Sequence, residues 1–295
     1  MAKKPRILVG QVAAITGAAR GIGKATAEAF VREGMKVAIG DLDVDLARQA
    51  AAEIGPNAEG FALDVTRRDS FEAFVDAVEE RLGPIDVLVN NAGIMPLGRF
   101  IEEDDATAIR LIDINVHGVM LGMKIVLLRM MVRNRGYVVN IASQAGKYGA
   151  PGGATYSATK HAVIGLTEAV RGELHIDRSA VELSYVMPFV VNTELGAGTG
   201  EAFGLKHLQP SQVADAIVHA LEYRVVDVWV PRSSHRTQRL NQLLPRRLSE
   251  RIARAMKADR VLMGADKQAR AAYELRAARS EPGIEPADEP SRLAS

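Results

Sequence analysis

The chain of 295 residues contains no cysteine, and its apolar residues form no long uninterrupted run. The missing cysteines exclude disulfide scaffolds, thiolate metal sites and cysteine nucleophiles, and we predict no metal site. Because no stretch of about 18 uninterrupted apolar residues is present, we expect no membrane-spanning helix. The lack of cysteine also fits a reducing compartment, so we expect a cytoplasmic protein.

Net charge is nearly absent as well. The formal net charge is +1, which argues against nucleic acid or another polyanion as a partner of the whole chain. The charges are unevenly distributed, because residues 1–231 carry 23 basic and 28 acidic side chains whereas residues 232–295 carry 14 and 8. Hydrophobic residues make up 47% of the chain, enough to bury a core, which excludes disorder as its main state. We predict a near-neutral body and a basic tail.

Residues 3–15 are open to two interpretations. A basic start at residues 3–6 followed by apolar residues 7–15 imitates a secretory signal peptide, and it is also typical of a buried parallel strand. The glycine-rich segment 16–23 follows directly and leads into a helical pattern at residues 25–30. Cleavage here would destroy a strand–turn–helix unit, so we interpret residues 7–15 as a strand.

Apolar stretches of strand length alternate with helical patterns up to residue 231. We predict strands at residues 7–15, 36–40, 59–63, 85–89, 136–141, 181–186 and 226–230. Helical patterns lie between them, at residues 45–53, 104–134 and 154–176, and from residues 69 and 209 onward. Strands separated by helices require right-handed crossovers and a parallel sheet covered on both faces. We therefore predict one doubly wound α/β domain over residues 1–231.

The glycine-rich segment indicates a dinucleotide-binding turn. Gly17, Gly21 and Gly23 follow a strand and open a helix, so the backbone can approach a pyrophosphate at the helix N-terminus. Asp41 ends the second strand, where a carboxylate accepts hydrogen bonds from the adenosine ribose and repels a 2′-phosphate. If the Arg20 guanidinium holds that phosphate, it favours NADP, and if Arg20 is a solvated loop charge, it favours neither NAD nor NADP. Because Asp41 would clash directly with the phosphate, we predict NAD rather than NADP.

A second set of residues indicates acid–base chemistry on an alcohol or carbonyl group. Tyr156 and Lys160 are four residues apart and share one face of a predicted helix. A fixed ammonium near a phenol favours the phenolate, so we expect the Tyr156 pKa to be lowered from about 10 toward neutrality. Tyr156 then acts as general base toward an alcohol while a hydride leaves to a nicotinamide. Ser143 follows the fifth strand, at the edge where open α/β sheets bind ligands, and can hold the carbonyl oxygen.

Four motifs, in this order and spacing, resemble those of the short-chain dehydrogenase/reductase family. They are Thr16-Gly17-x-x-x-Gly21-Ile22-Gly23, Asn90-Asn91-Ala92-Gly93, Ser143 and Tyr156-x-x-x-Lys160. The resemblance covers about residues 7–231. It implies a Rossmann-type sheet of about seven parallel strands, and hydride transfer between NAD(P) and an alcohol–carbonyl pair.

The same resemblance assigns roles to individual residues. Lys160 is expected to bind the nicotinamide ribose as well as tuning Tyr156, and Asn115 to hold a water that links the lysine to solvent as a proton relay. Ser143 and Tyr156 are the expected substrate contacts, and Asn90 is expected to tie the central sheet together. The expected cofactor-binding set, with Asp64 and Val65 beside the adenine, comprises Gly17, Arg20, Gly21, Ile22, Gly23, Asp41, Asp64, Val65, Asn91, Ala92, Gly93, Tyr156, Lys160, Pro188, Val191 and Thr193.

One segment departs from the family pattern. After the sixth strand the family has Pro-Gly-x-Val-x-Thr, whereas this chain has Pro188-Phe189-Val190-Val191-Asn192-Thr193. Val191 and Thr193 keep the positions that hold the nicotinamide carboxamide. Phe189 stands where the family has glycine, a residue with greater backbone freedom. We favour a mild loop adjustment with the ring packed on the core or in the substrate pocket over altered nicotinamide placement in a slow, specialised enzyme.

The basic tail combines apolar and cationic residues at near-helical spacing. The apolar residues are Leu240, Leu243, Leu244, Leu248, Ile252 and Met256, and the cationic ones are Arg246, Arg247, Arg251, Arg254 and Lys257. Such a stretch covers the substrate mouth, packs on a neighbouring subunit or, the least favoured option, lies on an anionic membrane. Pro245 predicts two shorter helices, and residues 265–278 predict a further one. We predict a basic helical extension over residues 232–280 and a disordered end over residues 281–295.

These observations predict an NAD-dependent oxidoreductase that interconverts an alcohol and its ketone or aldehyde, with a secondary alcohol favoured. The loop at residues 194–209 offers Phe203, Leu205 and Leu208 as apolar contacts and no charge cluster, which favours a lipophilic, steroid-like or long-chain substrate. The alternatives are an NADP-dependent carbonyl reductase, a sugar-nucleotide epimerase and a non-catalytic nucleotide-sensing or membrane-docking protein. The family resemblance also implies a homodimer or homotetramer formed through the helices near residues 104–134 and 154–176.

Overall fold

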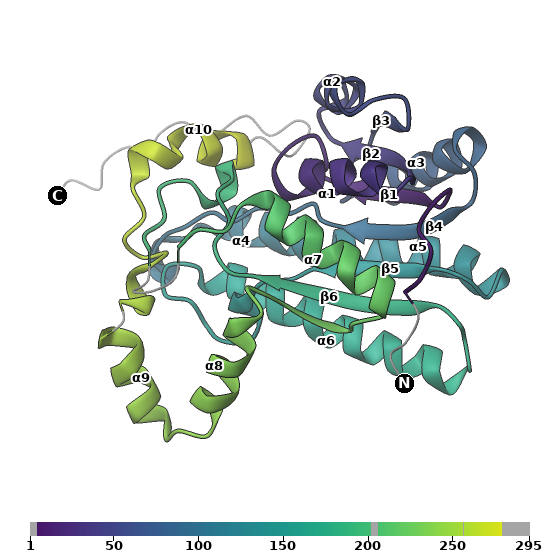
Figure 1. Ribbon diagram of the computed structural model, residues 1–295. Coiled ribbons are helices and arrows are strands. Elements are labelled where there is room, and N and C mark those ends of the chain that lie inside the picture. Colours follow the sequence, from purple (N-terminus) through teal and green to yellow (C-terminus); the bar gives the residue numbers. More distant parts are fainter. Residues whose placement is uncertain (1–4, 202–205, 256, 279–295) are drawn as a thin grey trace.

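The computed structural model describes residues 5–201, 206–255 and 257–278, and a sheet of seven parallel strands lies at its centre (Figure 1). The strand order is β3-β2-β1-β4-β5-β6-β7, so the direction of winding reverses between β1 and β4. The strands are β1 (Val12–Thr16), β2 (Lys36–Asp41), β3 (Ala58–Ala62), β4 (Ile85–Asn90), β5 (Tyr137–Ile141), β6 (Glu182–Pro188) and β7 (Asp227–Val230). The predicted strands are confirmed, although the first begins at Val12 rather than at residue 7.

Helices cover both faces of the sheet, as the doubly wound prediction requires. One face carries α1 (Gly21–Arg32), α2 (Val44–Ile54) and α7 (Pro210–Tyr223), and the other carries α3 (Arg68–Arg81), α4 (Asp105–Ile112), α5 (Gly118–Val132) and α6 (Ala154–Ile176). Successive strand residues alternate between the two cores, with Ala13 and Ile15 in one and Val12 and Ala14 in the other. Because both faces are buried, the strands are continuously apolar.

The long helix predicted at residues 104–134 is interrupted. A π-helical turn, η2 (Asp113–His117), joins α4 to α5 and carries the buried Asn115. By length and composition the span Asp105–Val132 also meets the requirements of a membrane-crossing helix, with a mean hydropathy of 1.7 in its most apolar window, which the sequence reasoning had not anticipated. Since 61% of that window is buried against the sheet and neighbouring helices, it is a core helix of the α/β domain.

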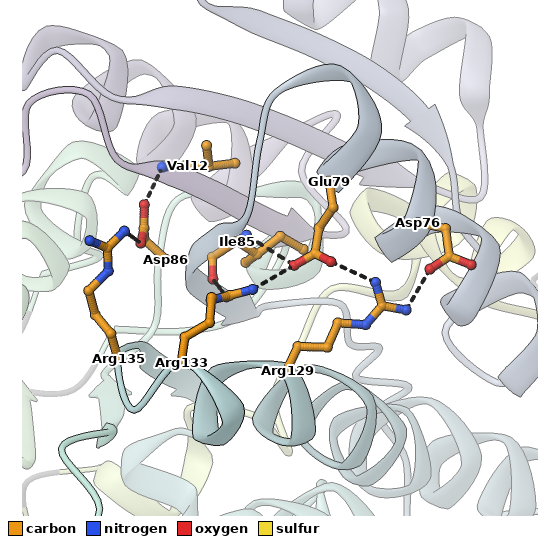
Figure 2. A network of polar contacts seen from close by, with 8 residues as sticks. All are labelled: Val12, Asp76, Glu79, Ile85, Asp86, Arg129, Arg133 and Arg135. Carbon is orange, nitrogen blue, oxygen red and sulfur yellow. Dashed lines mark hydrogen bonds and ion pairs between the residues drawn. The ribbon is translucent and has the colours of Figure 1, made fainter.

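A polar network joins α3, α5 and the start of β4 at the amino-terminal edge of the sheet, where the parallel strands begin (Figure 2). Glu79 accepts hydrogen bonds from Arg129 (2.8 Å) and Arg133 (3.1 Å) and from the first backbone N–H of β4. Asp86 joins Arg135 to the first backbone N–H of β1. Burial raises the pKa of Glu79, and the hydrogen bonds from the two arginines outweigh it and hold the pKa below its usual value.

Beyond β7 the chain forms a helical extension at one side of the molecule (Figure 1). It consists of α8 (Ser233–Gln242), α9 (Arg246–Ala255), the 3-10 turn η5 (Ala258–Arg260) and α10 (Lys267–Ala278). The two shorter helices on either side of Pro245 and the third helix agree with the sequence prediction. Other 3-10 turns are η1 (Phe100–Glu102), η3 (Gln144–Gly146) and η4 (Glu194–Gly196). Lys3, Lys4, Phe203, Leu205, Met256 and residues 281–295, about which the sequence made predictions, lie outside the described residues.

Candidate active site

The loops that follow the strands at the carboxyl edge of the sheet, together with the helical extension, enclose a cleft of about 1940 Å³. Sites for single drug-sized ligands measure about 300–1,000 Å³, so this cleft has room for a dinucleotide and a second molecule. The predicted site residues that line it are Gly17, Arg20, Gly21, Ile22, Asp41, Asp64, Val65, Asn91, Ala92, Gly93, Ser143, Tyr156, Lys160, Pro188, Val191 and Thr193. Gly23 and Asn115, which were predicted with them, do not line the cleft.

The glycine turn between β1 and α1 leaves space where a side chain would stand. Gly17 and Gly21 have positive φ angles of 61° and 57°, a conformation that favours glycine. A Cβ on Gly17 would meet the backbone of Ala92 at 2.8 Å, so the turn and the loop after β4 touch across the cleft floor. Gly23 lies behind the turn, where a Cβ would meet the Gly17 carbonyl oxygen at 2.6 Å. Gly23 therefore permits close packing of α1 and does not contact the cleft.

The N-terminus of α1 opens into this turn without a side-chain cap. Free backbone N–H groups and the positive end of the helix dipole make such a terminus suited to a phosphate. Thr16 supports the turn from below, because its Oγ1 accepts hydrogen bonds from the backbone N–H groups of Asn91 and Ala92, each at 3.0 Å. The Asn91 side chain donates to the carbonyl oxygens of Thr16 and Gly17, so it fixes the turn as well as lining the cleft.

Asp41 and Arg20 lie at the mouth of the turn and differ in how they are held. The Asp41 carboxylate accepts hydrogen bonds from the backbone N–H groups of Ala19 (3.1 Å) and Asp43 (3.2 Å), which fix it at the end of β2. The Arg20 guanidinium forms ion pairs with Asp43 (3.6 Å) and Glu194 (3.4 Å). Its charge is therefore compensated by carboxylates of this chain.

Asp64 presents an unsatisfied acceptor beside the cleft. One carboxylate oxygen accepts hydrogen bonds from the backbone and side chain of Thr66, at 2.9 and 2.7 Å. The other, Oδ2, is buried and has no partner among the described residues. Buried acceptors are normally paired, so this oxygen fits a ligand group that donates a hydrogen bond, such as an exocyclic amino group of a purine. Together with the glycine turn it shows that the residues present suit an adenine dinucleotide.

Ser143, Tyr156 and Lys160 come together from β5 and α6 at the other end of the cleft. Ser143 follows β5, caps η3 by accepting a hydrogen bond from the Ala145 N–H at 3.1 Å, and lies near the Tyr156 hydroxyl. Lys160, one turn along α6, is 4% exposed and donates to the Ile141 carbonyl oxygen at 2.8 Å. Its Nζ lies 5.7 Å from the centroid of the Tyr156 ring.

The structure corrects the predicted ionisation of Tyr156. Burial raises the pKa of Tyr156 to about 12, and the hydrogen bond with Ser143 opposes the rise only in part. Burial also lowers the pKa of Lys160 to about 8. The sequence argument counted the nearby ammonium but not the loss of water around the phenol, and in the chain without ligands desolvation is the larger effect.

Asn115 holds the loop after β4 in place. Its side chain accepts a hydrogen bond from the Ile94 N–H and donates to the Ile94 carbonyl oxygen, both at 2.9 Å. It also donates to the Thr159 hydroxyl at 3.2 Å. A Cβ on Gly93 would lie 3.1 Å from Asn115 Oδ1 and 3.6 Å from Lys160 Nζ, so both polar side chains surround this glycine. The relay role implied by the resemblance stays a prediction.

Comparison with known proteins decides the family. The sequence model of the family described as short chain dehydrogenase matches residues 11–202. The chain belongs to the short-chain dehydrogenase/reductase family. It is therefore an oxidoreductase that acts on CH–OH groups with NAD(P).

Several known members of the short-chain dehydrogenase/reductase family are similar to this chain. Sorbitol dehydrogenase of Cereibacter sphaeroides is 43% identical over 197 residues, which cover 66% of this chain and 76% of that protein. Galactitol 2-dehydrogenase of Agrobacterium fabrum is 42% identical over 185 residues, or 62% and 72%. A short-chain dehydrogenase/reductase from Burkholderia phymatum, solved in complex with NAD, superimposes with a TM-score of 0.74 at 26% identity, covering 80% of this chain and 94% of that one.

The segment that departs from the family pattern, residues 188–193, is held by contacts with the sheet and with the glycine turn. The Phe189 N–H donates to the Val230 carbonyl oxygen at 2.8 Å, and the half-buried ring packs against both hydrophobic cores while lining the cleft. Val191 pairs with Leu208 in a parallel bridge. A Cβ on Gly21 would lie 3.3 Å from Thr193 Cγ2, so the loop after β6 lies against the glycine turn. These contacts agree with the mild adjustment favoured from the sequence.

The helical extension beyond the matched family segment also contributes to the cleft. Leu240, Leu244 and Ile252, from the predicted amphipathic stretch, line it, and so does Tyr273 of α10. The sequence did not single out Tyr273 or its neighbour Arg270, because a helical pattern by itself does not show which side chain is buried.

Proposed function

We propose that this protein is an NAD-dependent dehydrogenase that interconverts a lipophilic secondary alcohol and its ketone. The observation that carries the proposal is the convergence of Ser143, Tyr156 and Lys160 in the same cleft as the glycine turn. A protein that only bound a nucleotide would not need a phenol and a hydroxyl converging on one point beside it.

The chain's own residues account for the proton movements. In the direction of oxidation, the Tyr156 phenolate takes the proton of the substrate hydroxyl while Ser143 donates a hydrogen bond to the same oxygen. In reduction, the phenol returns that proton to the carbonyl oxygen. Lys160 stabilises the phenolate by its charge when it is protonated. The nicotinamide ring of the bound cofactor supplies the hydride acceptor or donor.

The choice of NAD rests on Asp41 and Arg20. The Asp41 carboxylate is fixed at the end of β2, where it can accept hydrogen bonds from ribose hydroxyls and repel a 2′-phosphate. The Arg20 guanidinium, the residue best placed to hold such a phosphate, is already paired with Asp43 and Glu194. Both features support NAD, and an NADP-dependent carbonyl reductase is the competing proposal.

The proposed substrate class rests on the apolar side chains that line the cleft. They are Met95, Phe189, Val190, Leu195, Trp229, Leu240, Leu244, Ile252, Val261 and Leu262, and polar side chains such as Thr237 and Gln238 of α8 line the cleft with them. A polyol, the substrate class in the names of two relatives, would bury several hydroxyls against these apolar side chains. A secondary alcohol with an apolar body has a single hydroxyl to pair, and burial of its apolar part is favourable.

A matched substrate panel tests the proposal. We expect NADH formation with steroid-like and long-chain secondary alcohols at kcat/KM values about 10- to 100-fold above those for sorbitol and galactitol, since each unpaired buried hydroxyl costs about 1–3 kcal/mol. A preference for the polyols would refute the lipophilic assignment.

Thermal unfolding with NADH or NADPH tests cofactor binding, because a ligand at about 100 times its Kd stabilises the folded protein by about 2.7 kcal/mol. No shift with either cofactor would favour a non-catalytic protein.

Replacing Tyr156 tests the catalytic assignment directly. Tyr156→Phe removes the hydroxyl and keeps the ring, so we expect hydride transfer to fall by about 10²–10⁴-fold while NADH still binds. The matched control is Tyr137→Phe, which removes a buried hydroxyl bonded to Ser184 far from the cleft. The assignment is wrong if the two variants have equal turnover.

A further inference from the structure

Arg270 of α10 is the largest fully buried side chain in the described part of the molecule, at 2% exposure. A buried guanidinium is costly unless its donors are paired, and here four hydrogen bonds satisfy it. One goes to Glu274 on the same helix at 2.8 Å. The other three go to backbone carbonyl oxygens outside the helix, so Arg270 holds α10 to the rest of the molecule.

The three carbonyl groups belong to two loops at the carboxyl edge of the sheet, one after β4 and one after β6. Arg270 Nη2 donates to Met95, in the loop after β4, at 2.6 Å. Arg270 Nη1 donates to Leu195 (2.9 Å) and Ala197 (3.0 Å), in the loop after β6. One planar side chain therefore bridges the two loops, a geometry that a guanidinium allows and an ammonium does not.

Further contacts of α10 repeat the same pattern. The Met95 N–H donates to the Tyr273 hydroxyl at 2.6 Å, and the Arg270 guanidinium lies 4.9 Å from the centroid of the Tyr273 ring. At the start of α10 the Asp266 N–H donates to the Gly198 carbonyl oxygen at 2.8 Å. Near its end Arg276 forms an ion pair with Glu194, which also pairs with Arg20 of the glycine turn.

The bridged loops carry residues that line the proposed cofactor site. Ala92 and Gly93 precede Met95, and Val191 and Thr193 precede Leu195. We propose that α10 is a clasp that fixes the spacing of these two loops around the cofactor, with Arg270 as its positioning residue. The identity of the ligand rests on the proposed function, whereas the clasp itself rests on the hydrogen bonds of Arg270 and Tyr273.

Arg270 acts on the spacing of the two loops and not directly on the reacting groups. Ser143 follows β5, Tyr156 and Lys160 lie on α6, and the hydrogen bonds of Arg270 go to neither of these elements. Loss of the clasp should therefore weaken cofactor binding more than it slows turnover at saturating cofactor. A role in stability alone would lower the unfolding temperature and leave the Kd for cofactor of the folded protein unchanged.

The first test is Arg270→Met, which keeps an apolar stem and removes all of the donors. The matched control is Lys267→Met, which removes an exposed cation from the same helix. Trp229, the single tryptophan of the chain, lines the cleft and reports NADH binding by its fluorescence. We expect the Kd and KM for NADH to rise about 10- to 100-fold in Arg270→Met, with a smaller change in kcat, and wild-type values in Lys267→Met. Arg270→Lys should not restore binding.

Hydrogen exchange without any ligand provides the second test. In Arg270→Met, exchange should accelerate in peptides covering residues 91–98 and 189–199 and stay unchanged in α1 and β2. Tyr273→Phe, a milder change, should accelerate only the first of these peptides. Wild-type exchange and wild-type cofactor affinity in folded Arg270→Met would overturn the proposal. If the wild-type protein binds neither NADH nor NADPH, the proposed function fails, and exchange of the two loops still decides whether α10 holds them.

Discussion

At the residue scale, Asp41 and Arg20 place opposite charges at the mouth of the glycine turn. Asp41→Asn keeps an oxygen that accepts the Ala19 N–H and removes the negative charge. Because placing like charges side by side costs several kcal/mol, we expect the preference for NADH over NADPH, measured as a ratio of Kd values, to fall about 10- to 100-fold. Asp45→Asn, an exposed acid nearby in α2, is the control and should change nothing. An unchanged ratio in Asp41→Asn would remove the physical basis for choosing NAD.

The ionisation of Tyr156 gives the two reaction directions different pH dependences. With the Tyr156 pKa raised to about 12, the phenol is protonated at neutral pH, which is the form needed to reduce a carbonyl group. Oxidation of an alcohol needs the phenolate, whose population grows about tenfold per pH unit below the pKa. We therefore expect kcat/KM for oxidation to rise from pH 7 to about 8 and to rise less steeply above pH 8, where Lys160 loses the charge that stabilises the phenolate, while kcat/KM for reduction stays flat.

Replacing Ser143 tests whether the Tyr156 pKa controls the pH dependence of oxidation. The hydrogen bond from Ser143 lowers the Tyr156 pKa, so Ser143→Ala should move the rise in oxidation to higher pH. The measurement is a pH profile of oxidation for both proteins. A wild-type profile that is already flat above pH 7 would mean that bound ligands restore the near-neutral pKa expected from the sequence.

At the scale of elements, Glu79 connects α3 to α5 and β4 (Figure 2). Glu79→Gln keeps the shape and removes the charge that Arg129 and Arg133 share, so we expect the free energy of unfolding at pH 7 to fall by about 1–3 kcal/mol. Because the folded-state pKa of Glu79 lies below its usual value, this stabilisation is present above the unfolded-state pKa and lost as pH falls through the folded-state pKa.

Denaturant unfolding of Glu79→Gln at several pH values checks this expectation. The control is Glu80→Gln, the exposed neighbour, for which no loss is expected. The difference between wild type and Glu79→Gln should shrink at acid pH. Equal stability of both variants at pH 7 would show that the network adds nothing measurable.

The helices and strands were predicted with uneven success, because some of their ends and interruptions have a clear sequence signal and others have none. Residues 154–176 match α6 in full, and Pro210 marks the start of α7, where Gln209 and Gln212 form the capping box. The π-helical turn at Asp113–His117 was missed, because its side chains continue the apolar pattern of the helix. The first strand was drawn too long, since residues 7–9 are apolar enough for a strand but the parallel register with β2 and β4 begins only at Val12.

At the scale of the whole molecule, exposed apolar side chains gather on the long helices. Ile109 and Ile112 of α4, and Leu128 and Val132 of α5, are 49–89% exposed. Such patches are typical of protein interfaces, so we expect a dimer or tetramer in solution, measured by light scattering after size exclusion. Leu128→Lys should shift the mass toward the monomer, whereas Leu248→Lys, which replaces an exposed leucine of α9, should not. A monomeric wild-type protein would contradict the prediction.

Sequence reasoning by itself determined the parallel sheet, the glycine turn and the grouping of Ser143, Tyr156 and Lys160. It succeeded because strand length, helical period and four-residue spacing are local properties of the chain. The cytoplasmic location and the domain limits at residues 231 and 280 stay predictions. Only the tertiary structure decided which polar groups lose water. The buried phenol of Tyr156 and the buried guanidinium of Arg270 look in the sequence like a tuned base and a solvated cation, because burial depends on segments far apart in the chain.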